Sequence, residues 1–212
     1  MLNCTVFYNG DLHLQTRSGR IAAIPQASLL PSAYTVWKGG SALDQLLPYN
    51  RIAAVRYAQR WAYGRNPAFY DYENIGGDCT NFASQCVYAG SGVMNFAKDF
   101  GWYYIDANNK APAWTGVQYF YNFMTRTEET VGPVARTAAI SQLEPGDVVQ
   151  LSFDGDNWNH SPVVVRLLRK PAMRPADVLI AAHSYDSDNR PLSTYDYRAI
   201  RFLHFIGVRK SR

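Results

Sequence analysis

The stretch Gly76-Gly77-Asp78-Cys79 carries the residues best suited to chemistry in this chain. Two adjacent glycines do not fit a helix interior, so we expect a sharp turn before the cysteine. Asp78 is a preferred N-cap residue, and its carboxylate should accept from the free N–H groups of a helix that begins at Cys79. The positive end of that helix favours the thiolate, which is the nucleophilic form of cysteine.

The other cysteines do not support a different chemistry for Cys79. Cys86 lies seven residues further along, about 10 Å away in a continuous helix, which is too far for a disulfide. We interpret Cys86 as a core residue. A Cys-x-x-Cys redox pair is missing, and the three cysteines and four histidines do not fall at metal-ligand spacings, so we predict no cofactor and no metal. The competing interpretation of Cys79 is a buried structural cysteine.

A cysteine nucleophile needs a general base, and His160 has the most suitable context. It follows a polar loop and precedes the apolar run Val163–Val165, which is typical of a β-strand. His183 ends the next apolar run. If the two runs are neighbouring strands, His183 or Asp186 could hydrogen-bond the far nitrogen of His160 and fix its tautomer. Local sequence alone leaves open a loop histidine without a role.

The elements that must position these residues follow an α+β order. The pattern predicts helices near 51–63, 79–89 and 116–125, and strands near 148–153, 163–169, 178–183 and 201–208. Residues 6–14 alternate around Asn9-Gly10, which predicts a hairpin, and residues 21–47 are typical of an extended arm. Helices before antiparallel strands place the nucleophile helix against the sheet that carries the histidines.

Composition indicates a folded globular protein. The 212 residues are 47% hydrophobic and 18% charged, which excludes a disordered chain. No apolar run reaches the ~20 residues of a membrane span. The first residues carry no visible secretory signal, so the location is unknown: the chain is cytoplasmic as given, or it is a mature form or one released by another route. The net charge of +4 comes with no nucleic-acid-binding motif, so we interpret the basic C-terminal residues as a solvated edge and expect no nucleic-acid partner. We expect a monomer.

From Tyr49 to about Val208 the chain resembles the bacterial putative amidase domain family, above all in the block DCTNFASQC that spans residues 78–86. The further matches, in family order, are Tyr57-Ala58, Trp61-Ala62, Asn66-Pro67, Ala113-Trp114, Tyr119-Phe120, residues 145–150, His160-Ser161 and His183-Ser184. That family is related to the NlpC-type and CHAP cell-wall hydrolases, so the resemblance implies a papain-like core. Pro162 departs from the pattern, and because proline lacks an N–H we expect its strand to start late or lie at an edge.

The resemblance also implies roles for the site residues. It implies Cys79 as nucleophile, His160 as base and His183 as the third member, with Asp186 in reserve. It divides the chain into residues 1–47, of unassigned role, and a cysteine hydrolase domain over 48–212. The implied substrate is an amide bond in a peptidoglycan stem peptide or a related peptide, cleaved through a thioester. Relatives that act on cell walls work outside the cell, so location stays open.

Several alternatives remain open at this point. A catalytically silent module could bind peptide or glycan in the same groove, and an acyltransferase or effector could use the same Cys-His site. Several aromatic residues could line a groove, although such residues more often fill a core: Trp102, Trp114 and Trp158, with Tyr103, Tyr104 and Tyr185. Trp158 is the best candidate among them. The backbone N–H of the nucleophile would meet the oxyanion together with a second donor, for which Tyr70, Tyr72 and Asn74 are candidates.

Overall fold

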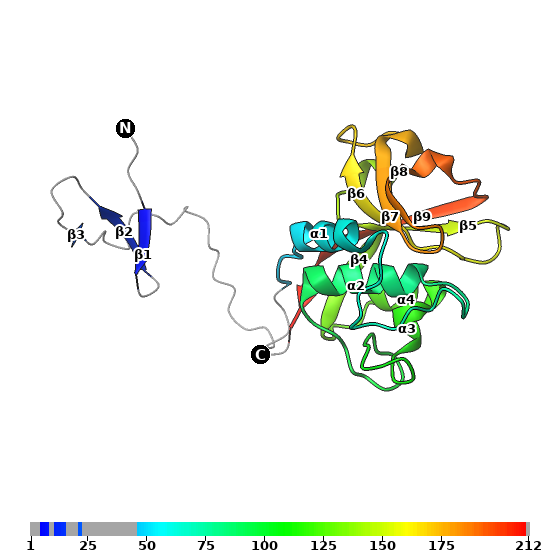
Figure 1. The fold of residues 1–212 in the computed structure, drawn as a ribbon, viewed down its shortest axis with the longest axis horizontal. Helices are drawn as coiled ribbons and strands as arrows, with labels where there is room; N and C mark the ends of the chain where they lie inside the picture. The colour runs from blue at the N-terminus through cyan, green and yellow to red at the C-terminus, as the bar shows by residue number, and fades with distance from the viewer. Residues whose placement is uncertain (1–4, 9–10, 16–20, 23–45, 211–212) are drawn as a thin grey trace. The chain divides into compact units, whose positions relative to one another are not determined.

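The computed structural model describes residues 5–8, 11–15, 21–22 and 46–210, and the chain divides into two compact units, Met1–Gly39 and Gly40–Arg212 (Figure 1). In the smaller unit β1 (Thr5–Tyr8) pairs antiparallel with β2 (Asp11–Gln15), and β2 pairs with β3 (Ile21–Ala22). Both strands of the predicted hairpin are therefore present. Its turn at Asn9-Gly10 and most of the predicted arm lie outside the described residues.

The larger unit begins with two helices at the predicted places. α1 (Arg51–Trp61) starts behind Asn50, whose side chain accepts from the Ala53 N–H at 3.0 Å. α2 (Cys79–Ser91) starts at the cysteine, as predicted. The sequence suggested that it ends before Gly90, but it continues to Ser91. Gly90 lies inside the helix, where a Cβ would clash with the Tyr49 ring, so no larger residue fits there. The left-handed residue that ends the helix is Gly92, with φ of 67°. α3 (Pro112–Thr115) and α4 (Val117–Met124) follow.

Six antiparallel strands form the sheet of this unit, in the order β4-β9-β5-β6-β7-β8. Their bounds are β4 Gly132–Ala138, β5 Val148–Ser152, β6 Val163–Leu167, β7 Val178–Ala182, β8 Ser187–Pro191 and β9 Ala199–Arg209. The predictions missed β4 and β8, the two edge strands, because neither is a clear apolar run. Residue Pro162 directly precedes β6, so this strand starts late as expected, but it lies inside the sheet.

Hydrophobic side chains pack on both faces of the sheet. The larger cluster joins the helices to one face through residues such as Phe82, Cys86 and Leu203, all fully buried. Cys86 is thus the core residue that the sequence predicted. The second cluster, around Leu151 and Ile180, covers the other face. The α+β order of helices followed by an antiparallel sheet is confirmed, with α1 and α2 side by side (Figure 1).

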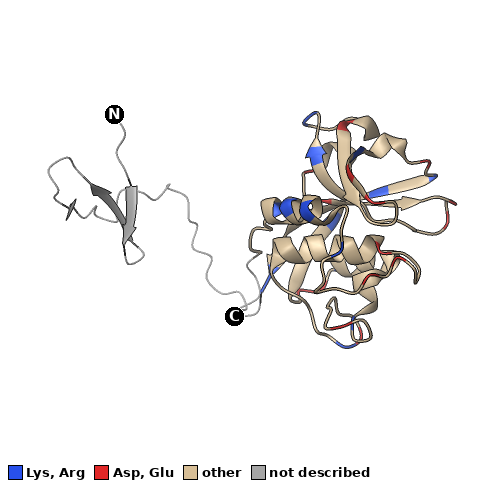
Figure 2. Cartoon of the chain, viewed as in Figure 1, with Lys and Arg blue, Asp and Glu red and all other residues tan. Residues whose placement is uncertain are grey.

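Over the residues that the structure describes, Lys and Arg are interspersed with Asp and Glu (Figure 2). Figure 2 shows Lys and Arg along α1 and scattered over the strands, among acidic positions. Arg51 is held at 2.7 Å by buried Asp147, which also hydrogen-bonds His204 at 2.8 Å. Among the described residues no helix is both long and apolar enough to span a membrane.

Candidate active site

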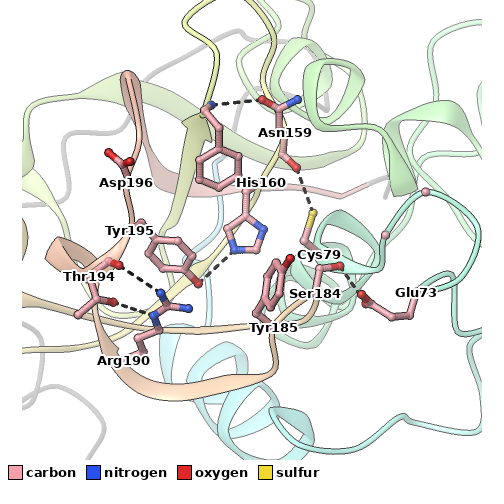
Figure 3. Close-up of a pocket in the computed structure, with 13 residues that line it drawn as sticks. Glu73, Cys79, Asn159, His160, Ser184, Tyr185, Arg190, Thr194, Tyr195 and Asp196 are labelled. Atoms are coloured by element: carbon pink, nitrogen blue, oxygen red, sulfur yellow. Dashed lines mark hydrogen bonds between the residues drawn. The ribbon is translucent and has the colours of Figure 1, made fainter.

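A cavity of about 540 Å³ brings Cys79 and His160 to the same space (Figure 3). Its walls come from the loop before α2, the loop between β5 and β6, the turn after β7, and the segment around β8 and the short 3-10 helix Leu192–Thr194. The lining residues are Glu73, Gly76, Gly77, Cys79, Phe153, Asn159, His160, Ser184, Tyr185, Arg190, Thr194, Tyr195 and Asp196. The two predicted catalytic residues therefore line one cavity, although 81 positions separate them.

The two glycines make the turn that delivers Cys79 to the start of α2. Gly76 and Gly77 have φ of 95° and 99°, values that L side chains rarely adopt. A Cβ on Gly77 would also lie 3.2 Å from Ser184 Oγ, at the cavity wall. Glycine is therefore required at both positions by the backbone path, and at Gly77 also by the close approach of Ser184.

The Cys79 thiol is nearly buried, with 7% of the residue exposed, and its sulfur donates to the Asn159 carbonyl at 3.7 Å. Burial raises the pKa of the thiol, while hydrogen bonds from Thr80 and from the Ser161 N–H act in the opposite direction. The predicted lowering of this pKa by the helix end is therefore wrong for the ligand-free site, because desolvation outweighs the favourable contacts.

Asp78 precedes the helix but does not cap it with its side chain. One carboxylate oxygen accepts from the Tyr72 N–H at 2.9 Å and from Asn81 Nδ2 at 2.8 Å. The other lies 2.6 Å from Nδ1 of His183. The capping prediction is wrong because these partners, drawn from the preceding loop and from the end of β7, take both oxygens. Asp78 thus ties the start of α2 to the sheet.

His183 does not hydrogen-bond His160, because both of its ring nitrogens have other partners, so the predicted bond between them is wrong. Its second nitrogen, Nε2, donates to the Trp61 carbonyl at 2.8 Å, and its ring stacks on Phe82 with centroids 4.0 Å apart. Both nitrogens are thus engaged at the buried base of α2. The reserve residue, Asp186, accepts two bonds from Arg65, at 2.9 and 3.1 Å.

Tyr195 takes the place that was predicted for His183. Its hydroxyl lies 3.2 Å from Nε2 of His160, and Figure 3 shows the other ring nitrogen on the side that faces Cys79. The Arg190 guanidinium lies 3.9 Å from the centroid of the Tyr195 ring, and its Nε donates to Thr194 Oγ1 at 2.7 Å. These contacts hold the Tyr195 ring in place. Sequence reasoning missed Tyr195 because it follows a 3-10 turn 35 residues after the histidine, where no local pattern marks it.

Burial keeps the imidazole of His160 neutral. The residue is 4% exposed, and burial, with a smaller contribution from the positive charge of Arg190, lowers its pKa to about 4. The ligand-free site therefore holds a neutral thiol and a neutral imidazole. Among the residues that the structure describes, no group of three His, Cys, Asp or Glu side chains is placed to hold a metal ion.

Most predicted groove aromatics lie elsewhere. Trp158 packs on Arg201, whose guanidinium is 4.0 Å from the ring, and Trp102 and Trp114 are fully buried in the core. Tyr185 does line the cavity, with 86% of the residue exposed. The loop before α2 contributes Glu73, Gly76 and Gly77 to the cavity wall. The predicted oxyanion donors from this loop, Tyr70, Tyr72 and Asn74, are not among the lining residues.

Comparison with known proteins shows which family this chain matches. A family model described as a putative amidase domain matches residues 48–206. The chain is also 32% identical, over 171 residues, to the uncharacterized protein YhbB of Bacillus subtilis (strain 168). The match covers 77% of this chain and 52% of YhbB, so the chain spans about half the length of that relative. No solved structure matches.

Proposed function

Because the chain belongs to the putative amidase domain family, we propose that it hydrolyses amide bonds with Cys79 as nucleophile and His160 as general base. The observation that carries the proposal is the meeting of these two side chains in one cavity, with His160 oriented by Tyr195. A cysteine at a helix start and a histidine at a later strand form the arrangement of a papain-like core, to which we assign the domain.

The first half of the reaction transfers the acyl group to sulfur. With Nε2 of His160 donating to the Tyr195 oxygen, Nδ1 is free to accept the thiol proton. The sulfur of Cys79 attacks the carbonyl carbon, a C–S bond forms, and the carbonyl oxygen becomes an oxyanion. As the C–N bond breaks, His160 returns the proton to the departing amine, which leaves a thioester.

Water completes the cycle. His160 removes a proton from water, hydroxide attacks the thioester carbon, and the carboxylic acid leaves as the thiol is restored. Cys79 is the first residue of α2, so its backbone N–H has no acceptor within the helix and can donate to the oxyanion. Because the Cys79 thiol and the His160 imidazole are both neutral before the substrate binds, the proton moves from sulfur to His160 during the attack. His160 therefore acts as a general base and is not already an imidazolium.

The cavity suits a polar peptide. Glu73 and Asp196 contribute negative charge, Arg190 contributes positive charge, and Tyr185 and Phe153 add aromatic surface. Such a wall fits a substrate that carries both carboxylate and amine groups next to the amide that is cleaved. We therefore propose a peptidoglycan stem peptide or a related peptide linkage as the substrate class.

The test is digestion of purified peptidoglycan and its soluble stem peptides in H₂¹⁸O, with mass spectrometry of the products. We expect a new amine and a new carboxylate that carries ¹⁸O, with both lost in Cys79→Ala and His160→Ala but kept in Cys86→Ala. Cleavage that survives Cys79→Ala would overturn the proposal. Binding of the peptides without cleavage would identify a binding module, and products joined only to an added amine would identify a transferase.

A further inference from the structure

A buried chain of polar side chains leads away from the Cys79 sulfur. Thr80 Oγ1 lies 3.8 Å from the sulfur and 3.0 Å from Ser161 Oγ. Gln150 Nε2 lies 3.3 Å from Ser161 Oγ, and Arg201 Nε donates to Gln150 Oε1 at 2.8 Å. We call these residues, Thr80, Ser161, Gln150 and Arg201, the polar chain. Its first three members are almost completely buried.

The far end of the polar chain fixes the direction of its first two hydrogen bonds, from Arg201 to Gln150 and from Gln150 to Ser161. An arginine can only donate, so the amide oxygen of Gln150 must face Arg201. The backbone carbonyl of Val117, which can only accept, lies 2.9 Å from the other amide atom and independently makes it the nitrogen. Gln150 therefore donates to Ser161 Oγ.

One consistent arrangement continues this direction to the sulfur. Ser161 accepts from Gln150, so its own hydrogen is available to Thr80 Oγ1. When Ser161 donates that hydrogen, Thr80 accepts it, and the Thr80 hydroxyl hydrogen can point at Cys79 Sγ. The thiol hydrogen is directed at the Asn159 carbonyl, so the sulfur can accept. A serine or threonine hydroxyl without this upstream donor could rotate and accept from the thiol instead.

We propose that the polar chain keeps the Thr80 hydroxyl donating to the Cys79 sulfur and thereby stabilises the thiolate. Its members are positioning residues, since they act on the nucleophile and not on the substrate. Their use in catalysis rests on the function proposed above, whereas their effect on thiol ionisation does not. Donors held in fixed directions cost no reorganisation when the negative charge forms.

Other groups around the sulfur set the background against which the polar chain acts. Burial raises the thiol pKa, and the negative charge of Asp78 adds to that rise. The Asn159 carbonyl accepts from the thiol and so favours the protonated form. His160 and Tyr195 face the sulfur from the other walls, with Glu73 and Arg190 further along the cavity. Against these, the Thr80 hydroxyl and the Thr80 and Ser161 N–H groups favour the thiolate.

Arg201 is itself held in place at the far end. Its guanidinium lies 3.7 Å from the Tyr121 ring centroid and 4.0 Å from that of Trp158. It also donates to Gln118 Oε1 at 3.1 Å. Burial lowers its pKa to about 10, so it stays charged at neutral pH. The aromatic residue that the sequence suggested for a substrate groove thus supports the anchor of the polar chain.

The experiment measures the pKa of the Cys79 thiol in the full-length protein. Thiolate ultraviolet absorbance is recorded against pH as a difference from the matching Cys79→Ala protein, and alkylation by iodoacetamide is mapped to Cys79 by peptide mass. Thr80→Val removes the hydroxyl at nearly constant shape, whereas Thr80→Ser keeps it. Ser84→Ala is the matched control, because it removes an equally buried hydroxyl of α2 that bonds Trp114 and Trp102 instead.

We expect Thr80→Val to raise the thiol pKa by about one unit, which slows alkylation at pH 6 about tenfold. Ser161→Ala and Arg201→Met, which act at a distance, should slow it roughly threefold. Thr80→Ser and Ser84→Ala should behave like the wild type. Should Thr80→Val not fold, the Ser161 and Arg201 variants carry the test.

Two results would overturn the proposal. One is a thiol pKa that is the same in Thr80→Val, Ser161→Ala and the wild type. The other is an equal rise in Ser84→Ala, which would mean that any loosening of α2 has the same effect. Failure of the proposed function looks different, because the thiol pKa would shift as expected while the wild-type protein cleaved no amide.

Discussion

Protonation of His160 should weaken the fold, and the structure gives the size of the effect. The imidazole pKa is about 4 in the folded protein and 6.5 in an ordinary environment. Above pH 6.5 the ring is neutral in both states. Between pH 6.5 and 4 the unfolded chain binds a proton at His160 that the folded chain does not, so the free energy of unfolding falls. At about 1.4 kcal/mol per pH unit, the loss is about 3 kcal/mol.

A variant that cannot titrate isolates this contribution. His160→Gln keeps a polar side chain of similar reach, and the carboxylates that titrate in the same range are common to both proteins. Urea unfolding, followed by tryptophan fluorescence at a series of pH values, gives the free energy of each. We expect the difference, wild type minus His160→Gln, to fall by about 3 kcal/mol from pH 7 to pH 4.

The opposite charge state would give the opposite slope. If His160 were an imidazolium paired with a Cys79 thiolate, its folded pKa would be raised and the wild type would gain stability relative to the variant on acidification. A difference that stays flat or rises towards pH 4 would refute the neutral resting pair. Repeating the series in Cys79→Ala shows whether the sulfur contributes to the result.

Three further substitutions test other contacts of the site. Tyr195→Phe should lower kcat roughly tenfold with little change in KM, because His160 loses the bond that orients its ring; an unchanged kcat would remove Tyr195 from the mechanism. Tyr185 has φ of 77°, a strained value for a residue with a side chain, so Tyr185→Gly should raise the free energy of unfolding by about 1 kcal/mol in urea titrations. The same change removes an aromatic ring from the cavity wall and should raise KM. A less stable protein would contradict this account of strain. Asp78→Asn should cost about 3 kcal/mol by the same assay, because it breaks a buried pair with His183; a loss below about 1 kcal/mol would contradict that role.

Much of the scaffold could be predicted because the deciding signals are local. Asn50 caps α1, and the Gly-Gly-Asp turn starts α2 at Cys79, as the sequence indicated. The apolar runs gave the central strands, while the edge strands β4 and β8 lack such a signal. The charge state of Cys79 was not predictable in this way, because it depends on how deeply the finished fold buries the sulfur.

The partners within the site depend on tertiary contacts that no local pattern contains. His183 had the right sequence context to orient His160, yet Asp78 and the Trp61 carbonyl take both of its nitrogens. Tyr195 reaches His160 only because the segment after β8 folds back over the far face of the sheet. Only the assembled fold reveals which of these side chains faces the imidazole.

The central claim is that Cys79 carries the acyl group during turnover, and acid-quenched reactions test it most directly. The protein is mixed with an activated ester of a short acylated peptide, quenched within the first turnover, and mapped by peptide mass. We predict the acyl mass on the peptide that contains Cys79, its removal by hydroxylamine, and its absence in Cys79→Ala, while His160→Ala accumulates it slowly. Turnover without an adduct on Cys79, or turnover by Cys79→Ala, would contradict the account.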